Sequence, residues 1–379
     1  MTQDSLSLDN LMAIADQFGG GGQISQVQPF GSGNINDTFL VTVQGKNAEK
    51  MIGKSEHHFV LQRINTQVFQ QPQLVMQNMR IFSEHVQECL TADTFCLNRR
   101  WEVPRVLLTT DGRDHYQENN NFWRSISFIE GSQTFDTIQD LDHARETGFG
   151  LGMFHRSIST LPTSQLADTL PGFHITPSYL RQFDEVVASK IVPKSAEVVH
   201  CFRFVEERRS WATVLEDAKE RGELPLRTIH GDPKINNVLI DTTTQRAISL
   251  IDLDTIKPGL IHYDIGDCLR SGCNPAGEET ADWEAVHFES EIGQVMLQGY
   301  LDSAQDFLTD NDYKYIYDSL RLLAFELGLR FFTDYLNGSV YFKTKYPEHN
   351  LLRALVQFRL TASIETQERT IGNIISDMR

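Results

Sequence analysis

The stretch HGDPKINN (230–237) and the tetrapeptide IDLD (251–254) decide the interpretation of this chain. They place Asp232, Asn237 and Asp252 beside apolar runs, in that order. A lone Asp is more often a helix cap or a hydrogen-bonded core carboxylate. Phosphoryl transfer, however, needs one carboxylate to accept the proton of the attacking hydroxyl, and an amide oxygen and a second carboxylate to hold Mg²⁺. Because the three residues match that set, the spacing predicts a phosphoryl-transfer site.

Length and composition predict an acidic protein with two lobes. The chain has 379 residues, of which 40% are hydrophobic and 22% charged, so it can bury a sizeable core. Its net charge of -17 repels phosphate backbones, so we expect no nucleic-acid partner. The five cysteines are scattered, the N-terminus does not resemble a signal peptide, and charged residues interrupt the apolar stretch 320–332. These features favour a cytoplasmic protein with reduced thiols and no membrane span.

Hydrophobic periodicity predicts a β-rich N-terminal part and a mainly helical remainder. Helices are expected at 5–18 and from about Pro72. Alternating β-branched and aromatic residues predict strands at 23–30, 38–43, 59–64 and 122–131, with two more around an Asp111-Gly112 turn. Beyond the boundary segment EGSQ (130–133), the pattern predicts strands only at 237–241 and 247–253. We therefore expect an N-terminal lobe at 1–131 and a C-terminal lobe at 132–379.

A glycine-rich element in the N-terminal part is a candidate phosphate-binding loop. FGSGNINDTFLV (30–41) places Gly31, Gly33 and Asn34 between two strand-like runs, where backbone amides can donate to phosphate oxygens. Most Gly-x-Gly pairs are ordinary turns, so this interpretation depends on the later motif.

Arg63 is a candidate cation for the α- and β-phosphates. In the expected strand FVLQRI (59–64) it shares a face with Phe59 and Leu61. A solvated arginine on an edge strand is an equally good interpretation. If Arg63 is functional, Glu84 or Glu88 of the following helix is its expected partner.

Several motifs together resemble the aminoglycoside phosphotransferase/choline kinase family, and within it the N-acetylhexosamine 1-kinases. The pair HGDPKINNVLID and LIDLDTIKPGLIHYDIGD (250–267) carries the resemblance to the family. The segments GSGNINDTFLV, VLQRINTQVF, FIEGSQTFD, RFFTDYLNGSVYF and EHNLLRALVQF extend it over nearly the full length. His230 and Gly231 stand where protein kinases carry the His-Arg of their catalytic loop.

The resemblance implies a bilobal, protein-kinase-like α+β fold that binds ATP and Mg²⁺. It implies that Asp232 is the catalytic base, that Asn237 and Asp252 bind Mg²⁺ with Asp254 nearby, and that Arg330 and Tyr341 hold a sugar. The segment 127–131, and with it Phe128, Ile129 and Glu130, would be the hinge that meets adenine. Asp264 and Asp267 would brace the catalytic loop.

Two positions depart from the sugar-kinase pattern. Asn34 stands where the glycine loop often carries His, and Ser271 stands where an aromatic residue could pack on a sugar ring. Both leave phosphoryl transfer intact and put the substrate in question. His155, His174 and His349 are expected to be core or capping residues.

We therefore expect an ATP-dependent kinase that phosphorylates the anomeric hydroxyl of an N-acetylhexosamine, GlcNAc or GalNAc. One alternative is another hydroxyl acceptor: an aminoglycoside, an amino alcohol or homoserine. The other is a regulatory pseudokinase, which would lack Asp232, Asn237 or Asp252, although all three are present. The oligomeric state and the physiological acceptor do not follow from the sequence.

Overall fold

The computed structural model describes residues 7–19, 22–31, 35–44, 56–92, 99–191 and 193–379. These residues divide into two compact units. The first lies within 1–96 and 102–131, and the second within 97–101 and 132–379.

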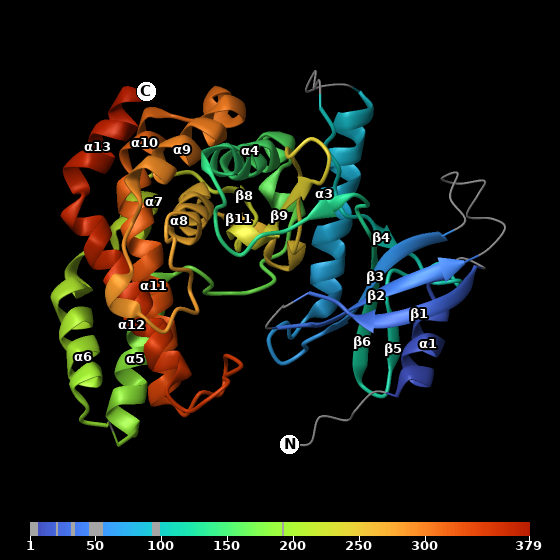
Figure 1. Ribbon diagram of the computed structural model, residues 1–379, viewed down its shortest axis with the longest axis horizontal. Helices are drawn as coiled ribbons and strands as arrows, with labels where there is room; N and C mark the ends of the chain where they lie inside the picture. Colours follow the sequence, from blue (N-terminus) through green and yellow to red (C-terminus); the bar gives the residue numbers. More distant parts are fainter. Residues whose placement is uncertain (1–6, 20–21, 32–34, 45–55, 93–98, 192) are drawn as a thin grey trace. The chain divides into compact units, whose positions relative to one another are not determined.

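The first unit is an antiparallel β-sheet with helices (Figure 1). Its strands are ordered β1-β2-β3-β6-β4, and β5 also pairs with β6. The helix α1 begins after Ser7, whose hydroxyl accepts a hydrogen bond from the amide of Asn10, and α3 begins at a proline, which is favourable there. The elements are α1 (Leu8–Asp16), β1 (Gln23–Pro29), β2 (Asp37–Gln44), β3 (Glu56–Ile64), α3 (Pro72–Thr91), β4 (Val106–Leu107), β5 (Tyr116–Glu118) and β6 (Asn121–Ser127).

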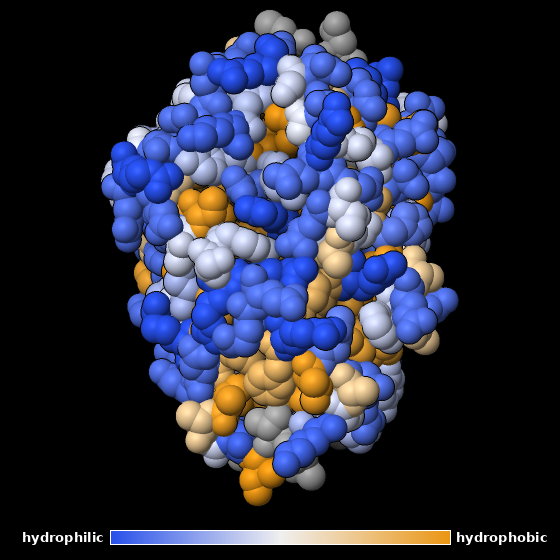
Figure 2. Space-filling model, turned by 90° about the vertical axis from the view of Figure 1, so that its left-hand side faces the viewer, coloured by the Kyte–Doolittle hydropathy of each residue, from blue (hydrophilic) through white to orange (hydrophobic). Residues whose placement is uncertain are grey.

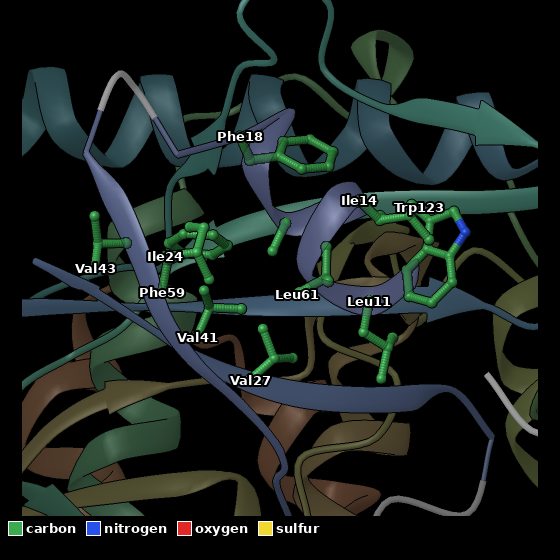
Figure 3. Close-up of a cluster of buried hydrophobic side chains, with 11 residues drawn as sticks. Leu11, Ile14, Phe18, Ile24, Val27, Val41, Val43, Phe59, Leu61 and Trp123 are labelled. Atoms are coloured by element: carbon green, nitrogen blue, oxygen red, sulfur yellow. The ribbon is translucent and has the colours of Figure 1, made fainter. Parts of the chain in front are cut away.

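Alternation along β3 sends its side chains to the two faces of this sheet. Phe59 and Leu61 lie in an apolar cluster with α1 (Figure 3), whereas Ile64 packs with residues of α3. Phe59 is 2% and Leu61 0% exposed, and burial of such a side chain contributes about 1.5–3 kcal/mol. The helices α1 and α3 therefore cover opposite faces.

The two strands predicted around the Asp111-Gly112 turn are present as β4 and β5. A tight turn does form there, since Gly112 has a φ of 83° and its amide donates to Thr109 O at 2.9 Å. The flanking strands β4 and β5, however, each pair with β6 rather than with each other. The turn could be predicted from its residues, whereas the pairing of both flanking strands with β6 could not.

The second unit is mainly helical and contains two small sheets, ordered β10-β9-β7 and β11-β8. The strands expected at 237–241 and 247–253 are present as the antiparallel pair β9 and β10, whereas β7, β8 and β11 were not predicted. The strands are β7 (Ser132–Gln133), β8 (Arg227–Ile229), β9 (Val238–Asp241), β10 (Ala247–Leu250) and β11 (Lys257–Gly259). The helices are α4 (Leu141–Ile158), α5 (Thr176–Ser189), α6 (Ala196–Arg208), α7 (Val214–Glu220), α8 (Ile261–Gly272), α9 (Ser290–Ala304), α10 (Asp310–Lys314), α11 (Ile316–Leu336), α12 (His349–Thr366) and α13 (Glu368–Asp377).

The face of the second unit that carries α5, α6 and α13 is mostly hydrophilic (Figure 2). Apolar side chains gather on it near the end where α5 and α6 are joined, and Ile191 of that connection is 99% exposed. The apolar segment 320–332 lies within α11, where Glu326 is buried. Among the described residues, no helix is long and apolar enough to cross a membrane.

The crossing of α4 and α9 depends on glycines. A Cβ atom at Gly299 would lie 2.0 Å from the carbonyl oxygen of Arg145, and one at Gly148 would lie 1.9 Å from that of Met296. Real Cβ atoms do not approach a backbone oxygen so closely, so any larger residue forces the two helices apart.

We expect Gly299→Ala to lower the free energy of unfolding by about 1–3 kcal/mol, because it overpacks a helix crossing. Urea denaturation followed by circular dichroism measures this. Gly372→Ala in α13 is the control, because its Cβ would meet no atom within 4 Å. That change should be neutral or stabilise by up to about 1 kcal/mol through helix propensity. Equal stability of the two variants would contradict the close-packed crossing.

Candidate active site

The loop 230–237 connects β8 to β9 and brings together three of the predicted site residues. Asn237 Nδ2 donates to the carbonyl oxygen of Asp232 at 2.7 Å. The backbone amide of Ile251 donates to the carbonyl oxygen of Asn237 at 2.9 Å. Asp252, the next residue in the chain, therefore lies beside Asn237. His230 Nε2 donates to Ile251 O at 2.9 Å. Asp232, Asn237 and Asp252 are thereby held at one place, although 252 is distant from 232 in the chain.

Asp264 of α8 anchors the start of this loop through hydrogen bonds. Its carboxylate accepts hydrogen bonds from the amides of His230 and Gly231 at 2.7 and 2.8 Å, and from His155 Nε2 at 2.8 Å. Burial acts to raise the pKa of Asp264, but His155 and the neighbouring donors outweigh it and lower that pKa. Asp264 is therefore an ionised anchor of the loop, as the resemblance implied.

Gly231 is required by both space and conformation. Its φ is 88°, and a Cβ atom there would lie 2.8 Å from the carbonyl oxygen of Thr255. The residue after it is therefore presented at the surface of the loop, where the Asp232 side chain is 30% exposed.

Lys234 is the functional candidate that sequence reasoning missed. Its ammonium lies 2.9 Å from Asp232 Oδ2. Burial acts to raise the pKa of Asp232, but Lys234 outweighs it and lowers that pKa, so this carboxyl group is ionised at neutral pH. Asp232, and to a smaller extent Asp252, raise the pKa of Lys234, which therefore stays charged. The sequence did offer a signal, because a lysine two residues after an aspartate, as in HGDPK, is within reach of that carboxylate.

Asn237 and Asp252 fit a magnesium ion by the chemistry of their atoms. The bond to Asp232 uses the amide nitrogen of Asn237, so its oxygen is the atom that can bind a cation. Asp252 has φ 65° and ψ 58°, a left-handed conformation that an Asp adopts more readily than most residues. Amide and carboxylate oxygens are ligands that Mg²⁺ prefers. Among the described residues no cluster of three or more His, Cys, Asp or Glu side chains forms a larger metal site.

A second acidic group, Asp267, lies close to Asp232. Asp267 is 5% exposed and is paired with Arg270, whose Nε is 2.7 Å from Asp267 Oδ1. Among the described residues nothing donates a hydrogen bond to its other oxygen, Oδ2. Burial, with a contribution from Asp232, raises the pKa of Asp267. The carboxyl groups of Asp232 and Asp267 therefore interact electrostatically.

Arg330 lies in a cage of aromatic rings. Its guanidinium carbon is 5.1 Å from the ring centres of Phe173 and Tyr179 and 5.5 Å from that of Phe342. Among the described residues, none forms a hydrogen bond or an ion pair with this guanidinium. Ion pairs on the helix surface with Glu326 and Asp334 would have given Arg330 a purely structural role. Among the described residues these ion pairs are not formed.

Both acidic neighbours of Arg330 are engaged elsewhere. Glu326 binds His174 and Thr176, and Asp334 accepts the backbone amides of residues 340–342. The second of these amides belongs to Tyr341, whose side chain is 44% exposed. Gly338, with a φ of 95°, ends α11 and lets the chain turn into this segment.

Ser271 is the second position that departs from the sugar-kinase pattern. It is 8% exposed, and its hydroxyl accepts a hydrogen bond from the amide of Ile235 at 3.0 Å. The side chain thus supports the catalytic loop from α8. An aromatic residue could not make that bond.

The first unit holds the residues predicted to bind the nucleotide. Gly31 is exposed with a φ of 74°, whereas Gly33 and Asn34 lie outside the described residues. In the predicted hinge, Phe128 packs edge-on against Phe30 and His58, with ring centres 5.8 and 5.7 Å apart. Ile129 is buried, and Glu130 Oε1 lies 2.7 Å from His58 Nδ1.

The predicted partner of Arg63 is wrong. Arg63 Nε donates to Asp37 Oδ2 at 2.9 Å across the β2–β3 ladder, and the guanidinium lies 5.9 Å from the ring centre of Trp123. Arg63 shares the α1 face with Phe59 and Leu61, whereas Glu84 and Glu88 belong to α3 on the opposite face. Pairing across the sheet is therefore excluded by the alternation of the strand.

The fold and the site define a kinase-like phosphotransferase. The model of the phosphotransferase enzyme family (APH) matches residues 26–293, so the chain belongs to that family. The prediction of the family is confirmed at this level.

Solved structures share the fold over nearly the whole chain. An aminoglycoside phosphotransferase from Alicyclobacillus acidocaldarius is 14% identical with a TM-score of 0.61, and the match covers 98% of both chains. A choline kinase from Cryptosporidium parvum Iowa II is 14% identical with a TM-score of 0.60, and covers 98% of this chain and 99% of its own. A spectinomycin phosphotransferase in complex with ADP and spectinomycin is 12% identical with a TM-score of 0.56, and covers 97% and 99%. The predicted α+β kinase-like fold, with a β-rich N-terminal and a helical C-terminal part, is confirmed.

Proposed function

We propose that this protein transfers the γ-phosphoryl group of ATP to the anomeric hydroxyl of an N-acetylhexosamine and forms the sugar 1-phosphate. The observation that carries the proposal is the arrangement of the loop 230–237, in which an ionised Asp232 stands beside the oxygen ligands of Asn237 and Asp252. These groups are what phosphoryl transfer requires of a protein. Their presence also opposes the pseudokinase alternative.

Asp232 accepts the proton of the acceptor hydroxyl as the oxygen attacks the γ-phosphorus. The bond between that phosphorus and the bridging oxygen breaks, and ADP leaves. An anomeric hydroxyl is more acidic than an ordinary alcohol, so a carboxylate of low pKa suffices as the base. Lys234, fixed against Asp232, supplies a positive charge to the negative phosphoryl oxygens.

In this proposal Asn237 and Asp252 are the residues that would hold Mg²⁺. The bound ion would neutralise phosphate charge during transfer. The nucleotide is ATP, and the ADP in the spectinomycin phosphotransferase complex supports an adenine nucleotide. The region 1–131 is the nucleotide-binding lobe, with Gly31, the hinge 128–130 and Arg63 as its contacts. The region 132–379 is the catalytic and acceptor-binding lobe.

Arg330 and Tyr341 recognise the acceptor. Burial acts to lower the pKa of Arg330, but Tyr179, Tyr341, Glu326 and Asp232 outweigh it and raise that pKa. The guanidinium is therefore charged, faces aromatic rings and is within electrostatic reach of the base. It can donate to sugar oxygens or to an N-acetyl carbonyl. A fixed cation at this position disfavours a cationic acceptor.

A cationic acceptor is nevertheless the second candidate, because near Asp232 one carboxylate oxygen of Asp267 receives no hydrogen bond from the residues that the structure describes. The choline kinase and aminoglycoside phosphotransferase similarities allow an amino alcohol or an aminoglycoside. A screen of ATP consumption over N-acetylhexosamines, other sugars, amino alcohols and aminoglycosides separates the two. Turnover with GlcNAc or GalNAc that is lost in Asp232→Asn supports the proposal, whereas turnover confined to amines refutes the sugar.

We expect Arg330→Ala and Tyr341→Phe each to lower kcat/KM for the acceptor by roughly 5- to 150-fold. A lost donor to a buried sugar oxygen costs about 1–3 kcal/mol. Initial rates at saturating ATP measure this, while the KM for ATP and the melting temperature should barely change.

Two matched controls exist in the chain. Tyr346→Phe alters a tyrosine that is also 44% exposed but packs on His349. Arg321→Ala removes an α11 arginine that is stacked on Trp211 and paired with Asp318. Both should leave the acceptor KM unchanged. If Arg330→Ala and Tyr341→Phe act only on stability or only on ATP, the acceptor site is elsewhere.

A further inference from the structure

His174 connects the catalytic loop to the helix that carries Arg330. Its Nε2 lies 2.6 Å from the carbonyl oxygen of Gly231, and its Nδ1 lies 2.9 Å from Glu326 Oε1. His174 and Glu326 are 152 positions apart in the chain. The imidazole is 4% exposed, and its backbone has a φ of 65°. A non-glycine residue in this left-handed conformation points to a constraint imposed by the surrounding structure.

The two partners of His174 decide how many protons the ring carries. A carbonyl oxygen can only accept a hydrogen bond, so Nε2 carries a proton. An ionised carboxylate also can only accept, so Nδ1 carries a second proton. Glu326 also accepts from the hydroxyl of Thr176 at 2.6 Å, which favours its ionised form. The arrangement is thus an imidazolium between a carbonyl and a carboxylate.

The other charges around the ring agree with this state. Burial acts to lower the pKa of His174, but Glu326 and, more weakly, Asp267 outweigh it and raise that pKa. Burial acts to raise the pKa of Glu326, but His174 and Arg330 outweigh it and lower that pKa. Tyr263 of α8 stacks on the ring with its centre 5.3 Å away and stays neutral, because burial raises its pKa.

The two contacts of His174 join the two halves of the proposed site. Gly231 precedes the base Asp232, and Glu326 stands one helical turn before Arg330 on α11. We propose that His174, doubly protonated, is a positioning residue that holds the catalytic loop at a fixed place relative to the acceptor-binding helix, so that phosphoryl transfer requires its charged form. This proposal rests on the proposed function of Asp232 and Arg330.

A pH dependence follows. Because the folded-state pKa of His174 lies above the ordinary value, the tie is complete below the ordinary pKa of histidine and is lost as the pH rises through the raised pKa. The neutral ring then keeps only one N–H and must release Gly231 or Glu326. Asp232 has a lowered pKa and Lys234 a raised one, so neither titrates in the same range. We therefore expect kcat to fall on the alkaline side with a single ionisation.

The principal test is Glu326→Gln, which keeps the size of the side chain and its acceptor oxygen but removes the charge. The alkaline limb of kcat should move to lower pH by about 1 unit or more, because a charge at hydrogen-bond distance no longer stabilises the imidazolium. His174→Asn is the second variant, since Asn tolerates the left-handed backbone. It should lower kcat roughly tenfold, abolish that limb and leave the KM for ATP within about twofold.

The pair His349 and Glu279 is the matched control. His349 is 2% exposed and its Nε2 lies 2.9 Å from Glu279 Oε2, but it belongs to α12 and does not contact the loop. Glu279→Gln and His349→Asn should leave the pH profile of kcat unchanged. An alkaline limb that stays in place in Glu326→Gln overturns the proposal.

Nuclear magnetic resonance of ring-labelled histidine gives a readout that needs no turnover. The His174 resonance, assigned by its loss in His174→Asn, should titrate above 6.5 in the wild-type chain and at lower pH in Glu326→Gln. Titration at or below 6.5 in the wild-type chain overturns the charged tie. Absence of turnover with every acceptor would instead refute the proposed function itself.

Discussion

Replacement of Asp232 by Asn is expected to lower kcat by at least about a hundredfold, the lower end of what a positioned base contributes. The amide cannot take the proton of the attacking hydroxyl, although its shape is nearly that of the carboxylate. Single-turnover rates with the acceptor found in the screen measure the effect. Calorimetry with ATP should show little change in affinity, because the carboxylate acts on the acceptor rather than on the nucleotide.

Asp302→Asn is a suitable control for a lost carboxylate, since Asp302 pairs with Arg145 at the surface. It should be fully active. Turnover close to the wild-type rate in Asp232→Asn would show that the base is another residue, and Asp267 would be the next to test.

Removal of the carboxylate proposed to bind the metal, by Asp252→Ala, is expected to lower turnover by at least about a hundredfold and to weaken Mg²⁺-dependent ATP binding. The change removes the anionic member of the pair proposed to hold Mg²⁺, and metal stabilisation of phosphoryl charge is worth several kcal/mol. Calorimetric titration of ATP with and without Mg²⁺ tests this independently of activity.

Asp252→Asn separates the lost charge from backbone strain. Alanine is poorly suited to the left-handed conformation at this position, whereas asparagine adopts it. Both variants should lose Mg²⁺ dependence, and only the alanine variant should also lose stability. An unaltered Mg²⁺ dependence would move the metal site, with Asp254, which is 3% exposed, as the next candidate.

Local chemistry explains which parts of the fold were predictable. Pro72 begins α3, Gly338 ends α11, and the apolar alternation at 237–253 forms β9 and β10. Each of these depends on residues close together in the chain. The strands β8 and β11 consist of three residues each and exist only because they pair with one another, so no local pattern could have indicated them.

The candidate site divides in the same way. HGDPKINN and IDLD named Asp232, Asn237 and Asp252, because their spacing along one loop and one hairpin is itself the motif. The partner of Arg63 was mispredicted because alternation shows which residues share a face, but not which helix covers that face. The role of Ser271 could not be predicted, because its bond to the amide of Ile235 depends on how α8 packs against the loop.

The family, the kinase-like fold and the candidate residues of phosphoryl transfer could be predicted from short motifs, because the chemistry of these motifs does not depend on distant neighbours. The contacts that hold those residues in place became visible in the folded chain alone. Asp264 anchors the loop from α8, and His174 ties it to Glu326 across 152 positions. Such contacts arise from the packing of whole helices, and burial then sets the protonation of the groups involved.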